Sequence, residues 1–87
     1  MSSIIVTITD EKKSFYYDLD VPSDLVAEKL VQDIVETLNG LNPILMLSHF
    51  GTSLVCSRTQ KRVHPNETLS DAHIRNGDYI ILSGGGY

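Results

Sequence analysis

The residues of this sequence whose types and spacing could do chemistry lie mainly at its C-terminal end. There, Gly84, Gly85 and Gly86 precede Tyr87. Three consecutive glycines carry no side chain that could pack, so they form a thin, flexible backbone thread that another protein could grip. A glycine run binds phosphate when a helix follows it and supplies an anion-binding N-terminus, and none follows here. The run therefore predicts a segment handled by a partner.

The histidines and the cysteine do not have the spacing of a metal site. His49, His64 and His73 form no close pair with one another or with Cys56, whereas metal ligands usually occur as pairs such as Cys-x-x-Cys or His-x-x-x-His. Cys56 falls inside an apolar run, where a cysteine is more often a small buried hydrophobe than a nucleophile. We expect no metal ion.

Ser70, Asp71 and His73 include the residue types of a hydrolytic triad, but they lie within one turn. Neighbouring residues of a turn cannot generally align as nucleophile, base and orienting group. We interpret Ser70 and Asp71 as groups that bond nearby backbone N–H groups. With no catalytic residue and no cofactor motif, the sequence predicts a protein that is not an enzyme.

Length and composition favour one small domain. The chain has 87 residues, of which 41% are hydrophobic and 21% charged. A domain of this size buries roughly 60 to 65% of its unfolded surface, so an enclosed substrate cavity is not expected. The net charge is −4, and the basic residues are scattered. We interpret the loose group Arg58, Lys61 and Arg62 as a solvated turn, and we expect no nucleic-acid partner.

Compartment signals indicate a soluble cytoplasmic protein. A single cysteine excludes an internal disulfide framework and fits a reducing compartment. The first residues lack the basic region, the apolar region and the cleavage site of a secretory signal. No window reaches the roughly 18 apolar residues of a membrane span.

The N-terminal half predicts a β-hairpin followed by a helix. Residues 4–9 and 14–21 are rich in β-branched and aromatic residues and alternate between two faces. Ser23 or Asp24 could cap a helix, and Asn39-Gly40 could end it in the left-handed conformation. Apolar residues recur at helical spacing between these signals at Val26, Leu30, Ile34 and Leu38.

The C-terminal half predicts three strands. Residues 53–57, 62–64 and 79–82 are strand-like, whereas residues 41–52 could form a strand, a helical turn or an apolar connector. The order of elements predicts an α+β β-grasp fold, in which a mixed sheet of four to five strands packs on one long helix. Its first and last strands would lie parallel in the sheet centre. The domain would span residues 1–83, and residues 84–87 would be a flexible tail.

Two segments resemble ubiquitin and its relatives. One is Val-Pro-Ser-Asp at residues 21–24, and the other is Thr-Leu-Ser-Asp-Ala-His-Ile at residues 68–74. Leu69 and Ile74 match the leucine and isoleucine that fill the core in that family. The continuation Ile-Arg-Asn-Gly-Asp at residues 74–78 is similar to the bacterial YukD-like branch, named after a component of type VII secretion loci. The resemblance implies the ubiquitin fold.

The glycine run departs from the YukD-like branch, whose members usually lack one, and resembles the end of conjugated ubiquitin-like modifiers. In those modifiers a C-terminal glycine carboxylate is adenylated and transferred to an acceptor. The resemblance implies removal of Tyr87 and conjugation through Gly86, which follows Gly85, with Ser83 and Gly84 completing the tail. The implied partners are an ATP-dependent adenylating activating enzyme, a conjugating enzyme, a deubiquitinase-like peptidase and an unidentified target protein.

The alternative implied by the resemblance is a non-covalent YukD-like binding module, such as an accessory of type VII secretion. By the period of two, Tyr79 and Ile81 should face away from the core, and with Arg62 or Val55 they could form a partner-binding patch. Residues 41–52 could instead cover these side chains. A glycine tail without any role also stays open.

Overall fold

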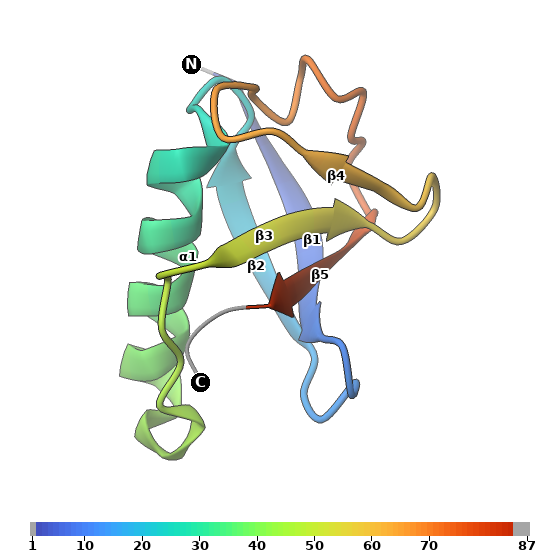
Figure 1. Ribbon diagram of the computed structural model, residues 1–87. Helices are drawn as coiled ribbons and strands as arrows, with labels where there is room; N and C mark the ends of the chain where they lie inside the picture. Colours follow the sequence, from blue (N-terminus) through green and yellow to red (C-terminus); the bar gives the residue numbers. More distant parts are fainter. Residues whose placement is uncertain (1, 85–87) are drawn as a thin grey trace.

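Five strands and one long helix make up residues 2–84, which are the part of the chain that the computed structural model describes (Figure 1). The elements are β1 (Ser3–Asp10), β2 (Tyr17–Pro22), α1 (Ala27–Leu41), the short 3-10 helix η1 (Pro43–Leu45), β3 (Thr52–Cys56), β4 (Lys61–Val63) and β5 (Tyr79–Gly84). The strand order is β2-β1-β5-β3-β4, with β1 and β5 parallel and the other pairs antiparallel. This topology confirms the predicted α+β β-grasp with its mixed sheet.

The core lies between one face of the sheet and α1. Alternation along β1 turns Val6 and Ile8 toward the helix, and Ile80 and Leu82 do the same from β5. The helix offers a broad apolar stripe in return, made of Ala27, Leu30, Val31, Ile34, Val35 and Leu38. The alternation predicted for both central strands is therefore confirmed.

The helix begins later than the sequence predicted, and no side chain caps it. The predicted caps Ser23 and Asp24 precede the N-cap position, which is occupied by Val26. The first free N–H groups, those of Ala27 and Glu28, instead donate to backbone carbonyls of the segment after β4, at 2.7 and 3.0 Å. Because the acceptors lie far away in the sequence, local capping rules could not find them.

The predicted helix stop at Asn39-Gly40 is also wrong, because α1 continues to Leu41. The Asn39 side chain binds the connector that follows: its amide nitrogen donates to the carbonyl of Leu47 at 2.9 Å, and its oxygen accepts from the N–H of Leu47 at 2.8 Å. Figure 1 shows this connector running back along the helix toward β3. Asn39 thus fastens the connector to α1 instead of ending the helix.

Of the ambiguous residues 41–52, Leu41 ends α1 and Thr52 begins β3, and the connector between them contains only the short helix η1 and turns. Several large apolar side chains of the connector face solvent, among them Ile44, Met46 and Phe50, which are 87, 83 and 75% exposed. Of the three possibilities left open by the sequence, the strand does not form, whereas a helical turn and an apolar connector both occur.

In the first of the two turns before β5, Asp71 bonds a nearby backbone N–H as predicted, but the second side chain that does so is Thr68 and not Ser70. Thr68 and Asp71 bond each other reciprocally, with the Thr68 N–H donating to the Asp71 carboxylate at 3.1 Å and the Asp71 N–H donating to the Thr68 hydroxyl at 3.0 Å. Gly77 has φ of 92°, the left-handed conformation that favours glycine. Between them, Leu69 and Ile74 are buried in the core.

Candidate binding surface

The outer face of the sheet brings together the residues proposed as a partner-binding patch. In the strand register, Val55 of β3 lies opposite Ile81 of β5 on one side and opposite Arg62 of β4 on the other. Tyr79 lies two residues before Ile81, on the same face, and is 49% exposed. The four residues thus form one continuous surface, which we call the outer-face patch.

Two aromatic or apolar residues extend the outer-face patch toward β2 and were missed from the sequence. The ring of Tyr16 packs edge-on against that of Tyr79, with centroids 6.2 Å apart. Ile5 in β1 lies on the same side and is about as exposed as Tyr79. The alternation of the sequence predicts that both residues face away from the core. Only the order of the strands in the sheet shows that they lie beside Tyr79.

The connector does not cover the outer-face patch, so that alternative is wrong. Residues 41–52 pack against α1, on the opposite side of the sheet, through the bonds of Asn39. Thr9, which pairs with Ile81, is buried although it faces outward, so larger neighbours pack over the middle of this face. The face combines a packed centre with accessible aromatic and apolar side chains, as protein-binding surfaces do.

The last described residues, Ser83 and Gly84, belong to the sheet and not to the predicted tail. Strand β5 extends through Ser83 and Gly84, which pair with Ser53 and Thr52 of β3. The carboxylate of Glu11 accepts a hydrogen bond from the Ser83 hydroxyl at 3.2 Å and from the Gly84 N–H at 3.1 Å. Backbone pairing does not need side chains, so a glycine can continue the strand.

The backbone of Gly84 lies close to the backbone of Gly51. Its φ is 79°, and a Cβ at this position would lie 2.9 Å from the carbonyl oxygen of Gly51. Only glycine fits such a position without displacing backbone. The predicted processing and conjugation residues Gly85, Gly86 and Tyr87 lie outside the described residues.

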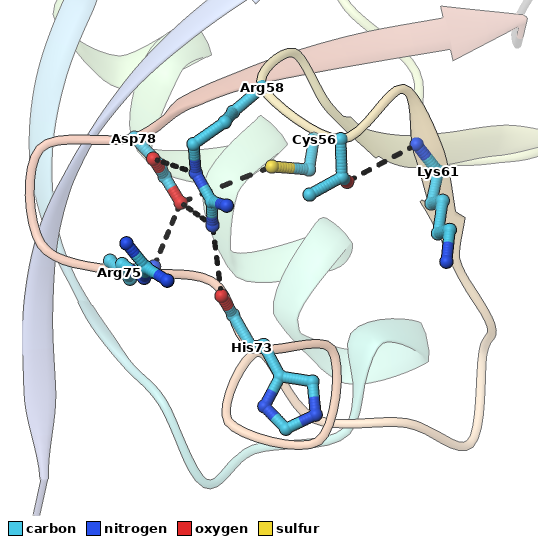
Figure 2. A network of polar contacts seen from close by, with 7 residues as sticks. Cys56, Arg58, Lys61, His73, Arg75 and Asp78 are labelled. Atoms are coloured by element: carbon cyan, nitrogen blue, oxygen red, sulfur yellow. Dashed lines mark hydrogen bonds and ion pairs between the residues drawn. The ribbon is translucent and has the colours of Figure 1, made fainter.

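A polar network fixes the hairpin that carries Arg62 against the loop that precedes Tyr79 (Figure 2). The guanidinium of Arg58 donates to both carboxylate oxygens of Asp78, at 3.1 and 3.0 Å, and to the carbonyl of His73 at 3.0 Å. The Arg75 N–H donates to the same carboxylate at 2.9 Å. Arg58 was interpreted from the sequence as part of a solvated turn. It instead holds the segments that carry Arg62 and Tyr79, at two ends of the outer-face patch, in a fixed relative position.

These hydrogen bonds control the titration of Asp78. Hydrogen bonding from the Arg58 guanidinium lowers the pKa of the Asp78 carboxyl below its ordinary value of 3.8, against the opposing effect of partial burial. A carboxyl whose pKa is lower in the folded protein than in the unfolded chain stabilises the fold at pH values above its pKa in the unfolded chain. This stabilisation is lost as the pH falls through the pKa that the carboxyl has in the folded protein.

We therefore expect Asp78→Asn to lower the free energy of unfolding by about 1 kcal/mol at pH 7, because the charge-assisted bonds are lost while Arg58 stays partly solvated. The difference between wild type and variant should shrink as the pH falls below about 4. Urea unfolding followed by circular dichroism at pH 7 and pH 3 measures it. A difference that grows toward pH 3 would contradict the assigned role of the carboxylate.

The other candidates for chemistry do not assemble into a site. Within residues 2–84, no three His, Cys, Asp or Glu side chains come close enough to hold a metal ion. Cys56 is buried, and its thiol donates a long hydrogen bond to the Asp78 carboxylate, with 4.0 Å between the sulfur and the oxygen. Asp71 is engaged with Thr68. No helix in the described part of the chain is long and apolar enough to cross a membrane.

Solved structures with this fold include ubiquitin-like proteins from several sources. The ubiquitin of Caldiarchaeum subterraneum has a TM-score of 0.72 at 14% identity, covering 99% of this chain and 98% of its own. The ubiquitin-like domain of the Mycobacterium tuberculosis type VII secretion system protein EccD1 has a TM-score of 0.73 at 18% identity, covering 97% and 100%. The EccD5 ubiquitin-like domain from Mycobacterium xenopi has a TM-score of 0.69 at 13% identity, covering 94% and 93%. At such identities the likeness shows the ubiquitin-like fold.

No protein with a curated description matches the chain. The sequence profile of protein YukD of the WXG100 protein secretion system (Wss) matches residues 3–82. The match runs from the first residue of β1 to Leu82 in β5, so it includes every element of the fold except the last two residues of β5. The chain belongs to the YukD family.

Proposed function

We propose that this protein is a non-enzymatic, cytoplasmic binding module of a WXG100, or type VII, secretion system, and that it engages a protein partner non-covalently through the outer-face patch. The observation that carries the proposal is the match of the YukD profile across residues 3–82. The occurrence of the same fold in the secretion proteins EccD1 and EccD5 supports it.

The outer-face patch has the properties that such binding requires. Tyr79 and Tyr16 are rigid aromatic side chains, each about half exposed, and Val55 and Ile81 add apolar area beside them. Aromatic residues and arginine are enriched among residues that dominate binding energy, and Arg62 lies at the end of the row. The module acts by holding this surface in a fixed shape on a rigid sheet.

Photo-cross-linking in cells tests this surface directly. Replacing Tyr79 by p-benzoylphenylalanine keeps an aromatic ring at the position, and we expect it to cross-link to a protein of the secretion system. The same amino acid at Lys29, on the solvent face of α1, is the control and should not cross-link to that protein. Cross-linking from position 29 and not from position 79 would overturn the assignment of the surface.

A second candidate function is covalent modification through Gly86, favoured by the glycine run at residues 84–86. It requires an activating enzyme, a conjugating enzyme and a peptidase that removes Tyr87. The adenylated glycine carboxylate would have to enter a narrow enzyme channel, for which glycines are suited. This function needs Gly85 and Gly86, whereas binding through the outer-face patch does not.

A further inference from the structure

A groove between α1 and β3 lies on the side of the sheet opposite the outer-face patch. Its volume is about 480 Å³, within the roughly 300 to 1,000 Å³ of many ligand sites. Core residues form its floor, namely Ala27, Val31, Leu54 and Val63. Residues 49–53, from the end of the connector and the start of β3, form one wall, and the side of α1 forms the other.

The wall formed by residues 49–53 is uncharged, and the exposed Phe50 is its one large apolar side chain beside polar residues. Phe50 is 75% exposed, and its ring packs on the ring of its neighbour His49, with centroids 4.3 Å apart. Residues 37–57 contain no Asp, Glu, Lys or Arg, so no formal charge lies along this wall. An exposed aromatic side chain above an apolar floor favours an apolar ligand.

The opposite wall carries one formal charge. Glu28 is the only Asp, Glu, Lys or Arg that lines the groove, and its backbone is held there by the hydrogen bond from its N–H to the Pro65 carbonyl at 3.0 Å. Within residues 2–84 the one ion pair joins Arg58 and Asp78, so Glu28 has no ion-pair partner in this part of the chain. A basic group on the ligand would complement it.

We infer that this groove binds a short apolar peptide segment of another protein that places one Lys or Arg against Glu28. The site is separate from the outer-face patch, so the protein can hold two partners at once. A membrane surface fits less well, because the groove has no lysine or arginine lining and the chain has a net charge of −4, whereas peripheral binding to anionic lipid uses basic residues.

Selection from a phage-displayed random peptide library, with the full chain as bait, tests the inference. Enriched peptides should combine apolar residues with a lysine or arginine, and a synthetic copy should shift the amide signals of Val31, Phe50 and Leu54. Glu28→Lys should reverse the preference, so that enriched peptides carry Asp or Glu. Phe50→Ser should lower the affinity for the peptide selected with the wild-type protein by roughly ten-fold or more.

Ile81→Glu, in the outer-face patch, is the matched control and should leave the affinity for the peptide unchanged. Peptide binding to the groove is therefore tested separately from the proposed function of the outer-face patch. Both groove substitutions are at exposed positions, and their amide spectra verify folding. The inference is overturned by a selection that enriches no peptide, by peptides without the basic preference, or by shifts confined to the outer face. Sedimentation with phosphatidylcholine–phosphatidylglycerol vesicles that depends on Phe50 would also overturn it, in favour of lipid.

Discussion

Replacing Ile80 by alanine is expected to destabilise the protein by about 2 to 5 kcal/mol, because it leaves a cavity in the centre of the core. Ile80 is 1% exposed and lies in β5, between β1 and β3. Small domains have a total free energy of unfolding of about 5 to 15 kcal/mol, so this substitution would remove a large part of it. Urea unfolding followed by circular dichroism measures the change.

Ile44→Ala is the matched control, since the same side chain is removed from a position that is 87% exposed. There the expected change is within about 0.5 kcal/mol, as for ordinary surface substitutions. Equal effects at the two positions would contradict the placement of the core between the sheet and α1. A large effect at Ile44 alone would mean that the connector packs differently.

The fold could be predicted because its decisive signals are local. The β-branched runs of β1 and β5, the helical spacing of Leu30 and Ile34, and the reciprocal Thr68–Asp71 turn each depend on neighbours in the sequence. The consistency of these local preferences with one another leaves few arrangements besides a β-grasp.

The helix ends could not be predicted because distant residues determine them. The first N–H groups of α1 bind carbonyls of Pro65 and Glu67, and Asn39 serves the connector through Leu47. Tertiary hydrogen bonds of this kind override the local preference for a side-chain cap or an Asn-Gly stop. Gly84 is a similar case, since its place in β5 depends on β3 and on Glu11.

The composition of the candidate binding surface was predicted in part. Alternation along β5 was enough to turn Tyr79 and Ile81 outward, and the predicted strands made Val55 and Arg62 candidates. Tyr16 precedes β2 and reaches Tyr79 only because β2, β1 and β5 are adjacent in that order. The groove beside Glu28 had no signal in the sequence, because the course of residues 41–52 was undetermined.

Ile81→Glu is expected to weaken binding of the secretion partner by about 30-fold or more, as for residues at the centre of an interface. Ile81 lies in the middle of the outer-face patch, next to Val55. A carboxylate there would be buried without a partner in the complex, which is costly. Because the side chain is only partly buried in the free protein, the fold should survive the change. Circular dichroism checks the fold, and cross-linking yield from position 79 checks binding.

Secretion of a WXG100 protein by cells tests the central claim most directly, namely that this YukD-family protein acts by non-covalent binding through its sheet. Cells would carry the full chain, the Ile81→Glu variant, or a chain truncated after Gly84, each expressed at equal levels. We predict that secretion is lost with Ile81→Glu and retained with the truncated chain. Retention with Ile81→Glu together with loss on truncation would contradict the account and favour covalent modification through Gly86.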